Sequence, residues 1–214
     1  MSKDYYRWAD IILEYLENVL IKKFSRLKSL LPLDEINPMN AVEETYSDIL
    51  NLVREAFLLL ANETARSLSF AADMESLSEQ WVDEMLEGYN PTSKVVFNNE
   101  FTRKRDRLVE SLLASNKKPE EVDAAKKSLM LMLNTYAILI ADGAALEVYA
   151  RENEATLQPG DGRTRNDYRV RWRAELDDRT CRTCWNLNGL VFWRSDLPSK
   201  PHFNCRCWFE RVTR

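Results

Sequence analysis

The sequence predicts an α+β protein that is mainly α-helical, with an elongated helical body followed by a small antiparallel β module. Apolar residues recur at helical spacing through the first three-quarters of the chain, and alternation of period two begins only after residue 162. Five glycines and seven prolines in 214 residues favour helices over a turn-rich all-β fold. We therefore place a helical body at residues 1–157 and a β module at residues 163–214.

The first half of the body is expected to hold two long helices. One covers residues 4–30 and ends before Pro32, where a proline-bounded loop begins. The second starts at Asn40 as N-cap, with Glu43 completing a capping box, and continues less regularly to Leu86. Gly88 and Asn90-Pro91 end it. The apolar positions that predict these helices are Trp8, Ile11, Ile12, Tyr15, Leu16, Val19, Leu20, Phe24, Leu27, Ile49, Leu52, Val53, Ala56, Phe57 and Leu60.

A shorter helix is expected at 98–115, and a last one begins at Pro119 with Glu120 and Glu121 in its first turn. Its buried stripe consists of Leu129, Met132, Leu133, Tyr136, Ala137, Ile140, Leu146 and Tyr149. The longest uncharged apolar run, 128–141, is too short for a bilayer, so no membrane segment is expected. The N-terminal residues carry no secretory signal, which predicts folding in a reducing cytosol.

Three strands are expected after the loop at 158–162. The first carries Tyr168, Val170 and Trp172 on one face and arginines on the other; the second covers 190–193 and the third 205–212. Four of the six tryptophans fall in this module and are expected to form its core: Trp172, Trp185, Trp193 and Trp208. From residue 163 on the net charge is +6, against −10 before it, which predicts two surfaces with different partners.

All four cysteines and the only histidine also lie in this module. Cys181 and Cys184 form a CxxC pair, and after seventeen residues come His202, Cys205 and Cys207 as HxxCxC. The two thiols of a CxxC turn suit one tetrahedral ion, and a segment that folds back through a hairpin supplies the second pair. We expect Cys181, Cys184, Cys205 and Cys207 to bind a structural zinc ion, with His202 as alternate ligand or outer partner.

A metal is expected because so small a module has little core of its own, and a closed cysteine site is structural rather than catalytic. Spacing alone does not decide between zinc, disulfides and free thiols. A Cys–His hydrolase is not indicated, since nothing marks an oxyanion hole or an orienting residue.

The motif around these ligands resembles that of a known family. Leu176-Asp-Asp-Arg-Thr-Cys181-x-x-Cys184-x-x-Leu-x-Gly189, followed by Pro201-His202-x-Asn204-Cys205-Arg206-Cys207, is similar to the C-terminal signature of tailed-phage minor head proteins, typified by the F protein of phage Mu. The likeness is confined to this module and the helix before it. Phe203 stands where the family usually has proline.

The resemblance implies a low-copy structural component of a phage or prophage head, made in the host cytoplasm and found in the virion. Its implied partners are the portal protein, capsid or scaffold proteins and phage DNA, and it aids head assembly or DNA packaging and ejection. The chain ends shortly after the motif, whereas some relatives continue into a toxin or enzyme domain. We therefore expect no enzymatic activity.

Two alternatives remain at the level of sequence. One is a nucleic-acid-binding zinc-ribbon-like protein with a helical dimerisation arm; the other is a carrier for an enzyme or toxin domain. Arg169, Arg171 and Arg173 could contact phosphates, or form a solvated face balanced by Asp177, Asp178 and acidic helices. The apolar helix stripes also leave self-association open.

Overall fold

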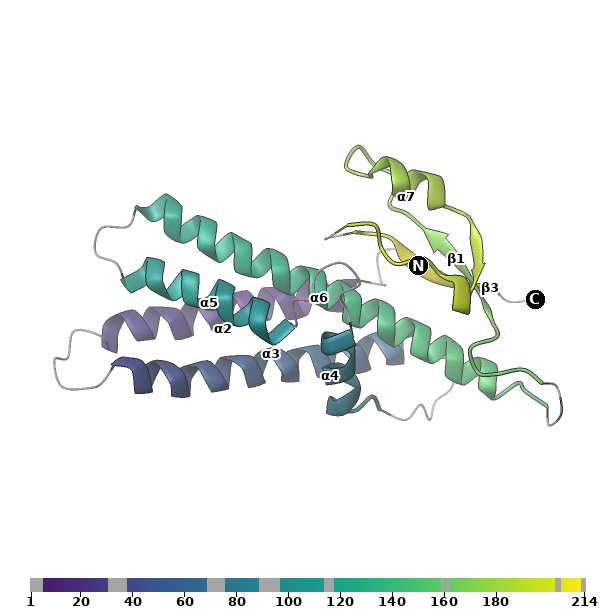
Figure 1. Cartoon of the computed structure of the whole chain (residues 1–214), viewed down its shortest axis with the longest axis horizontal. Helices are drawn as coiled ribbons and strands as arrows, with labels where there is room; N and C mark the ends of the chain where they lie inside the picture. The colour runs from purple at the N-terminus through teal and green to yellow at the C-terminus, as the bar shows by residue number, and fades with distance from the viewer. Residues whose placement is uncertain are drawn as a thin grey trace.

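Helix α6 (Pro119–Glu154) is the central element of the computed structural model (Figure 1). The structure describes residues 6–30, 38–68, 76–88, 97–113, 118–158, 160, 162–202 and 205–212. Around α6 pack α2 (Arg7–Leu30), α3 (Pro38–Leu68), α4 (Glu79–Gly88) and α5 (Phe97–Leu113). The chain is 68% helical with one small C-terminal sheet, so the predicted α+β class is confirmed.

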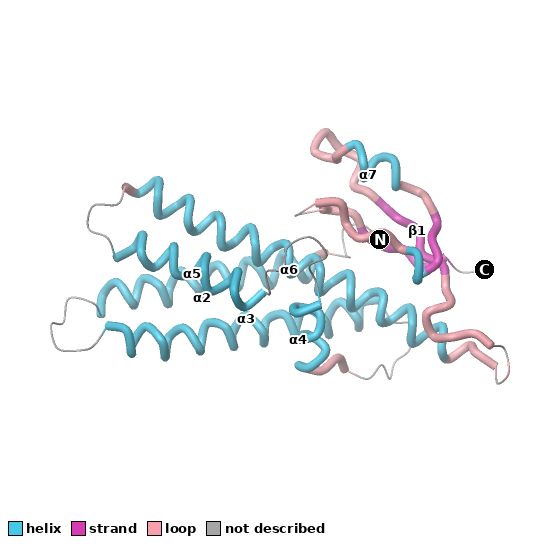
Figure 2. Tube along the Cα trace, viewed as in Figure 1, coloured by secondary structure: helices cyan, strands magenta, loops and turns pink. Residues whose placement is uncertain are grey.

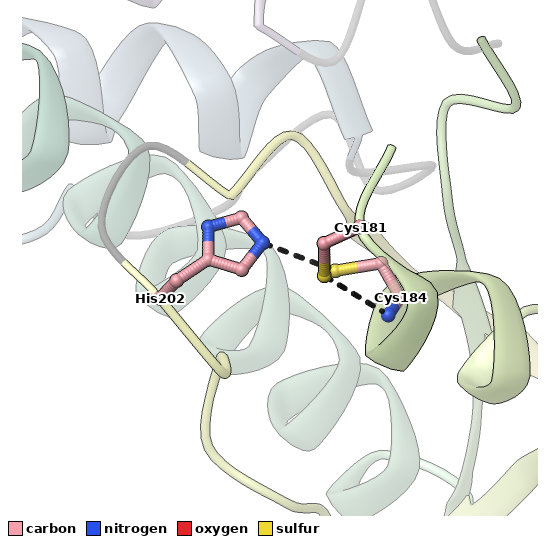
Figure 3. A group of neighbouring side chains, drawn as sticks. All are labelled: Cys181, Cys184 and His202. Atoms are coloured by element: carbon pink, nitrogen blue, oxygen red, sulfur yellow. Dashed lines mark hydrogen bonds between the residues drawn. The ribbon is translucent and has the colours of Figure 1, made fainter. Parts of the chain in front are cut away.

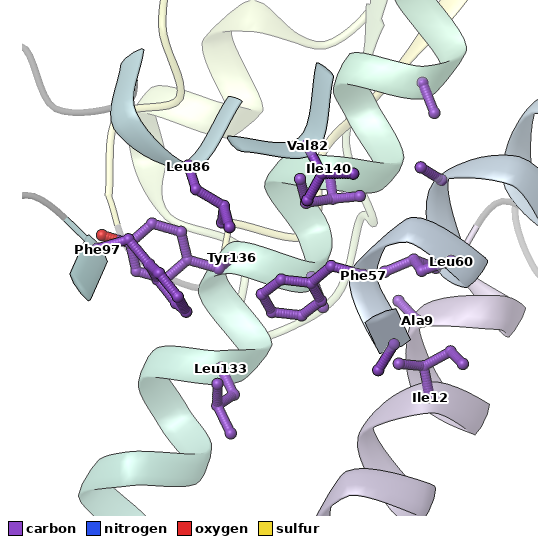
Figure 4. Packing of buried hydrophobic residues seen from close by; sticks show 14 of the residues in the cluster. Ala9, Ile12, Phe57, Leu60, Val82, Leu86, Phe97, Leu133, Tyr136 and Ile140 are labelled. Atoms are coloured by element: carbon purple, nitrogen blue, oxygen red, sulfur yellow. The ribbon is translucent and has the colours of Figure 1, made fainter. Parts of the chain in front are cut away.

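The core of the body forms where the apolar faces of five helices meet (Figure 4). Phe57 of α3, Phe97 of α5 and Tyr136 of α6 are all buried, and the last two rings meet edge-on with centroids 4.6 Å apart. Each large aromatic ring removes much apolar area from water, and the edge-on contact adds about 1 kcal/mol. Every residue of the predicted α6 stripe is buried except the half-buried Leu146.

The expected long helix from Asn40 to Leu86 is wrong in two respects. Helix α3 begins at Pro38, so Asn40 lies inside its first turn; a proline suits that position because it has no N–H to satisfy. The helix also ends at Leu68, and α4 starts separately after Ser78, whose Oγ accepts from the Trp81 N–H at 3.2 Å. This N-cap fixes a new helix start that periodicity does not reveal.

Asn62 of α3 holds the segment before α4 in place. Its amide oxygen accepts from the Leu77 N–H at 2.7 Å and its amide nitrogen donates to the Leu77 carbonyl at 3.2 Å. Helix α4 therefore packs back on the bundle instead of extending α3. The predicted helix-ending positions Pro32, Asn90-Pro91 and Ser115 lie outside the described residues.

By length and composition α6 is apolar enough to cross a membrane. From the sequence we expected no membrane segment, because the longest uncharged apolar run, 128–141, is too short to span a bilayer. In the structure, 67% of its most apolar stretch is buried against the rest of the protein. A core helix meets the same hydropathy criterion, and the contacts of α6 with four other helices account for its apolar character.

The C-terminal module is a three-stranded antiparallel sheet in the order β2-β1-β3 (Figure 2). Strand β1 (Arg169–Arg173) pairs with β2 (Val191–Trp193) and β3 (Trp208–Val212), and the short α7 (Arg182–Leu187) precedes β2. The third strand begins three residues later than predicted. Lys200 supplies the reason, because its ammonium donates to the carbonyls of Cys205 and Cys207.

The sheet packs one face on the C-terminal half of α6, as Figure 1 shows. Trp172 is fully buried there and meets Phe209 edge-on at 5.3 Å. Two tyrosine hydroxyls donate across the junction, from Tyr168 to the Leu146 carbonyl at 2.8 Å and from Tyr149 to the Phe209 carbonyl at 3.2 Å. Burial raises the pKa of both tyrosines to about 12.

The expectation that four tryptophans form the module core is only partly right. Trp172 is in the core and Trp208 is half-buried, but Trp185 and Trp193 are exposed. The helix α6 supplies the packing surface that these two side chains were expected to provide, so the sheet needs no second apolar layer.

Candidate metal centre

The CxxC pair lies at the start of α7. Cys181 is the N-cap of this helix, and its Sγ accepts from the Cys184 N–H at 3.4 Å (Figure 3). One turn of helix therefore brings the two thiols to the same side, as the spacing predicted. The same N–H lowers the pKa of Cys181, because it stabilises the thiolate.

The second half of the motif folds back onto the first. His202 Nε2 is 3.4 Å from Cys184 Sγ, and Cys205 Sγ is 3.5 Å from the same sulfur. Cys184, Cys205 and Cys207 are buried, Cys181 is half-buried and His202 is exposed at the rim. All five predicted ligands thus meet in one cluster, with Cys184 at its centre.

The spacing of these atoms is compatible with a metal ion. Cys181, Cys184 and His202 have ligand atoms within 4.8 Å of one another, and so do Cys184, Cys205 and Cys207. Two thiolates bound to one tetrahedral zinc at about 2.3 Å lie about 3.8 Å apart. The four cysteines are free thiols, so no disulfide joins the two halves of the motif.

The cysteine pKa values separate within the cluster. The hydrogen bond from Cys207 lowers the pKa of Cys205 to about 5, helped by the charge of Lys200. Cys207 has a raised pKa because it donates to Cys205, and burial raises that of Cys184 to about 12. Cys205 therefore favours the thiolate form beside protonated Cys184 and Cys207, and metal binding would release the remaining protons.

An ion pair joins the segments that carry the two halves of the motif. Arg206 donates to both carboxylate oxygens of Asp177, at 2.7 and 2.5 Å. Asp177 Oδ1 also accepts from the Arg179 N–H at 3.1 Å, as in a turn-capping aspartate. Arg206 holds the pKa of this carboxyl well below its usual range.

A buried network connects the cluster to the helical body. Lys200 forms an ion pair with Asp142 of α6 and donates to the Tyr6 hydroxyl at 2.9 Å. Tyr6, next to the start of α2, donates to Asp142 at 3.0 Å. Because Lys200 also contacts the carbonyls of Cys205 and Cys207, one ammonium joins α2, α6 and the ligand-bearing segment.

Trp172 contacts the cluster from the sheet side. Its indole Nε1 is buried and has no hydrogen-bond partner among the described residues. The indole N–H acts instead on Cys207, where it lowers the thiol pKa in opposition to the larger effects of Cys205 and burial. A buried donor near a sulfur ligand would stabilise the negative charge of a thiolate there.

A cavity of about 340 Å³ adjoins the cluster, between α4, α6 and residues 194–202. His202 and Cys205 lie on its wall beside the buried pair Asp142 and Lys200. Trp81 and Met85 close it from the α4 side.

The three arginines of β1 lie away from the metal cluster. Arg169 stacks over the Trp193 ring with its Cζ 4.9 Å from the centroid. Arg171 and Arg173 both pair with Glu210 of β3, at 3.2 and 2.9 Å. Glu210, directly across the ladder from Arg171 and diagonal to Arg173, balances these two arginines, in place of the Asp177, Asp178 and acidic helices that we expected.

Sequence reasoning missed Tyr6, Asp142, Lys200 and the Trp172 indole as parts of the site. Of these, only Lys200 had a local signal, since it directly precedes the Pro201-His202 half of the motif. Comparisons of the chain with protein-family models, curated proteins and solved structures find no match. We therefore argue its function from the site and from the motif resemblance.

Proposed function

We propose that this chain is a structural minor head protein of a tailed phage or prophage. In this role it associates with the portal and with capsid or scaffold proteins, aids head assembly or DNA packaging and ejection, and reaches the virion from the host cytoplasm. The proposal assigns it no catalytic activity. Its C-terminal module would be the unit that a structural zinc ion holds in shape.

One observation carries the proposal: the two halves of the head-protein-like motif, separated by seventeen residues, meet at a single cluster. Cys184 of the first half contacts both His202 and Cys205 of the second. Arg206 of the second half pairs with Asp177 of the first. The residues on which the resemblance rests therefore act as one structural unit. If the two halves of the motif matched the family only by chance, they would have no reason to lie in contact.

Zinc is the ion that this donor set suits best. Thiolates and imidazole are its usual structural ligands, and a site rich in cysteine has no open position for a substrate. We assign Cys181, Cys184, Cys205 and Cys207 as ligands and His202 as the alternate. The Trp172 indole and the Asp177–Arg206 pair would hold and orient these ligands. Phe203, the departure from the family pattern, lies outside the described residues.

The assignment to a phage head is tested by measuring how many copies of the chain each particle contains. Quantitative mass spectrometry on procapsids and virions of the encoding phage should find a small, fixed number of copies relative to the portal protein. The Cys184→Ser variant, which removes the sulfur shared by both groups of neighbouring ligands, should lower the number of copies incorporated without lowering expression. Absence of the wild-type chain from both particles, with normal expression in infected cells, would refute the proposal.

A further inference from the structure

The solvent-facing side of the sheet presents arginine and tryptophan together. We call this surface the outer sheet face; cross-strand register and alternation along the strands place on it Arg169, Arg171, Arg173, Val191, Trp193, Trp208 and Glu210. The opposite side, with Val170, Trp172 and Phe209, packs on the helical body. None of the described helices is needed to cover the outer sheet face, and its side chains are half-buried or exposed.

The outer sheet face carries an excess of positive charge. Arg171 and Arg173 share a single carboxylate, that of Glu210. Arg169 has its guanidinium over an indole ring. Three guanidinium groups against one carboxylate leave a positive face, within a module whose net charge from residue 163 on is +6. Such a face attracts a polyanion and discriminates against cationic surfaces.

The same face exposes flat aromatic and apolar surface. Trp193 is 45% exposed, and Val191, two residues before it in β2, is 43% exposed. Because the apolar core of the sheet lies on its other side, the Trp193 indole adds no buried layer to that core and contacts the Arg169 guanidinium instead. Exposed tryptophan next to arginine is the combination found where bases stack and phosphates pair.

We propose that the outer sheet face binds single-stranded nucleic acid. Arg171 and Arg173 would contact phosphates through their planar guanidinium forks. Trp193 and the guanidinium of Arg169 would stack on unpaired bases. A duplex keeps its bases stacked inside, so it offers phosphates to this face but no ring for Trp193. The inference stands independently of the head-protein proposal.

The competing occupant is the acidic body of a second copy, whose net charge before residue 163 is −10. The described structure favours nucleic acid, because the face sets an exposed indole beside its guanidinium groups, and some acidic groups of the body already have partners. Glu147 pairs with Arg151 and Arg165. Glu152 pairs with Arg211, and Asp83 with Arg54. A contact with a second copy through these groups would have to break such pairs, whereas a strand of phosphates needs no rearrangement of the body.

Fluorescence anisotropy with a labelled thymidine oligonucleotide of about 20 nucleotides tests the proposal on the full, zinc-loaded chain. Binding should be measurable at about 25 mM salt and weaken as salt rises, with log K against log salt sloping at about −1.4 for two phosphate contacts. An unlabelled duplex of the same length should compete less well than the single strand.

Four variants separate the contacts. The triple variant Arg169→Gln, Arg171→Gln and Arg173→Gln should lose about tenfold or more in affinity and flatten the salt slope. Trp193→Ala should weaken binding by about tenfold, and Trp193→Phe by less. Glu210→Gln should strengthen binding severalfold, because it releases two guanidinium groups from their carboxylate. The matched control, Arg103→Gln with Arg107→Gln, removes exposed charges of α5 and should change little.

The proposal fails if the folded wild-type chain does not bind at low salt, or if the control variant loses as much affinity as the arginine variant. It also fails if Glu210→Gln leaves affinity unchanged. A duplex that competes as well as the single strand overturns the stacking assignment. Salt-sensitive dimerisation that the arginine variant abolishes, without oligonucleotide binding, would assign the face to a second copy. None of these results bears on the head-protein proposal, which the copy number in phage heads tests separately.

Discussion

Arg206 and Asp177 form a bidentate ion pair, at 2.7 and 2.5 Å, that links the two segments carrying the cysteine ligands. Arg206 lies between Cys205 and Cys207, and Asp177 lies four residues before Cys181. The pair therefore fixes the distance between both halves of the motif before any metal binds. Its effect should appear in metal affinity, because outer partners orient the ligands of a metal site.

Asp177→Asn should lower zinc affinity about tenfold, since it removes the charge that holds Arg206. Competition with a chromophoric chelator measures this directly. Arg179→Gln is the matched control, because Arg179 is 3.8 Å from Asp177 and its side chain is 75% exposed. Equal affinities for wild type and Asp177→Asn would show that the cluster forms without the ion pair.

Substitution of the five candidate ligands should reduce zinc binding to different degrees. We expect about one zinc per wild-type chain and a lower melting temperature after chelation. Cys184→Ser should abolish binding, because Cys184 belongs to both groups of neighbouring ligand atoms. His202→Ala should keep the zinc, with reduced affinity at most. Elemental analysis of the purified variants gives the stoichiometry; zinc retained by Cys207→Ser but lost by His202→Ala would replace the four-cysteine assignment.

Lys200→Met should be one of the most destabilising single changes in the chain. It leaves the Asp142 carboxylate, whose side chain is 7% exposed, without its cation, and breaking one side of a buried ion pair costs about 3–5 kcal/mol. Urea denaturation measures the loss. The double variant Lys200→Met with Asp142→Leu should recover part of it, because no buried charge then remains. A double variant less stable than Lys200→Met alone would contradict this account.

Glu147 should make the module junction sensitive to acid. Burial alone would raise its pKa, but hydrogen bonds from Arg165 and Arg151 outweigh burial and lower the pKa below its ordinary 4.5. A lowered carboxyl pKa stabilises the fold above the ordinary value, and this stability is lost as pH falls through the lowered one. Glu147→Gln should therefore reduce the free energy of unfolding near pH 7 but not near pH 3. Glu110→Gln, at an exposed site on α5, is the control.

The class of fold and the cluster of ligands could be predicted from the sequence by itself. Apolar spacing marks the buried stripe of α6 because a helix repeats every 3.6 residues whatever packs on it. The alternation around Val170 and Trp172 marks a strand for the same local reason. The pairing of Cys181 with Cys184 also follows from spacing, since one helical turn brings both sulfurs to one side.

Only the tertiary structure decided which surfaces became core and what supports the cluster. Tyr6 lies 136 residues from Asp142 and 194 from Lys200 in sequence, so no local pattern could join them. The sequence likewise predicts the same core role for Trp172 and Trp193. In the structure Trp172 is buried against α6, whereas Trp193 is exposed on the outer sheet face. Burial depends on which elements meet, and that is set by the packing of the whole chain rather than by any one segment.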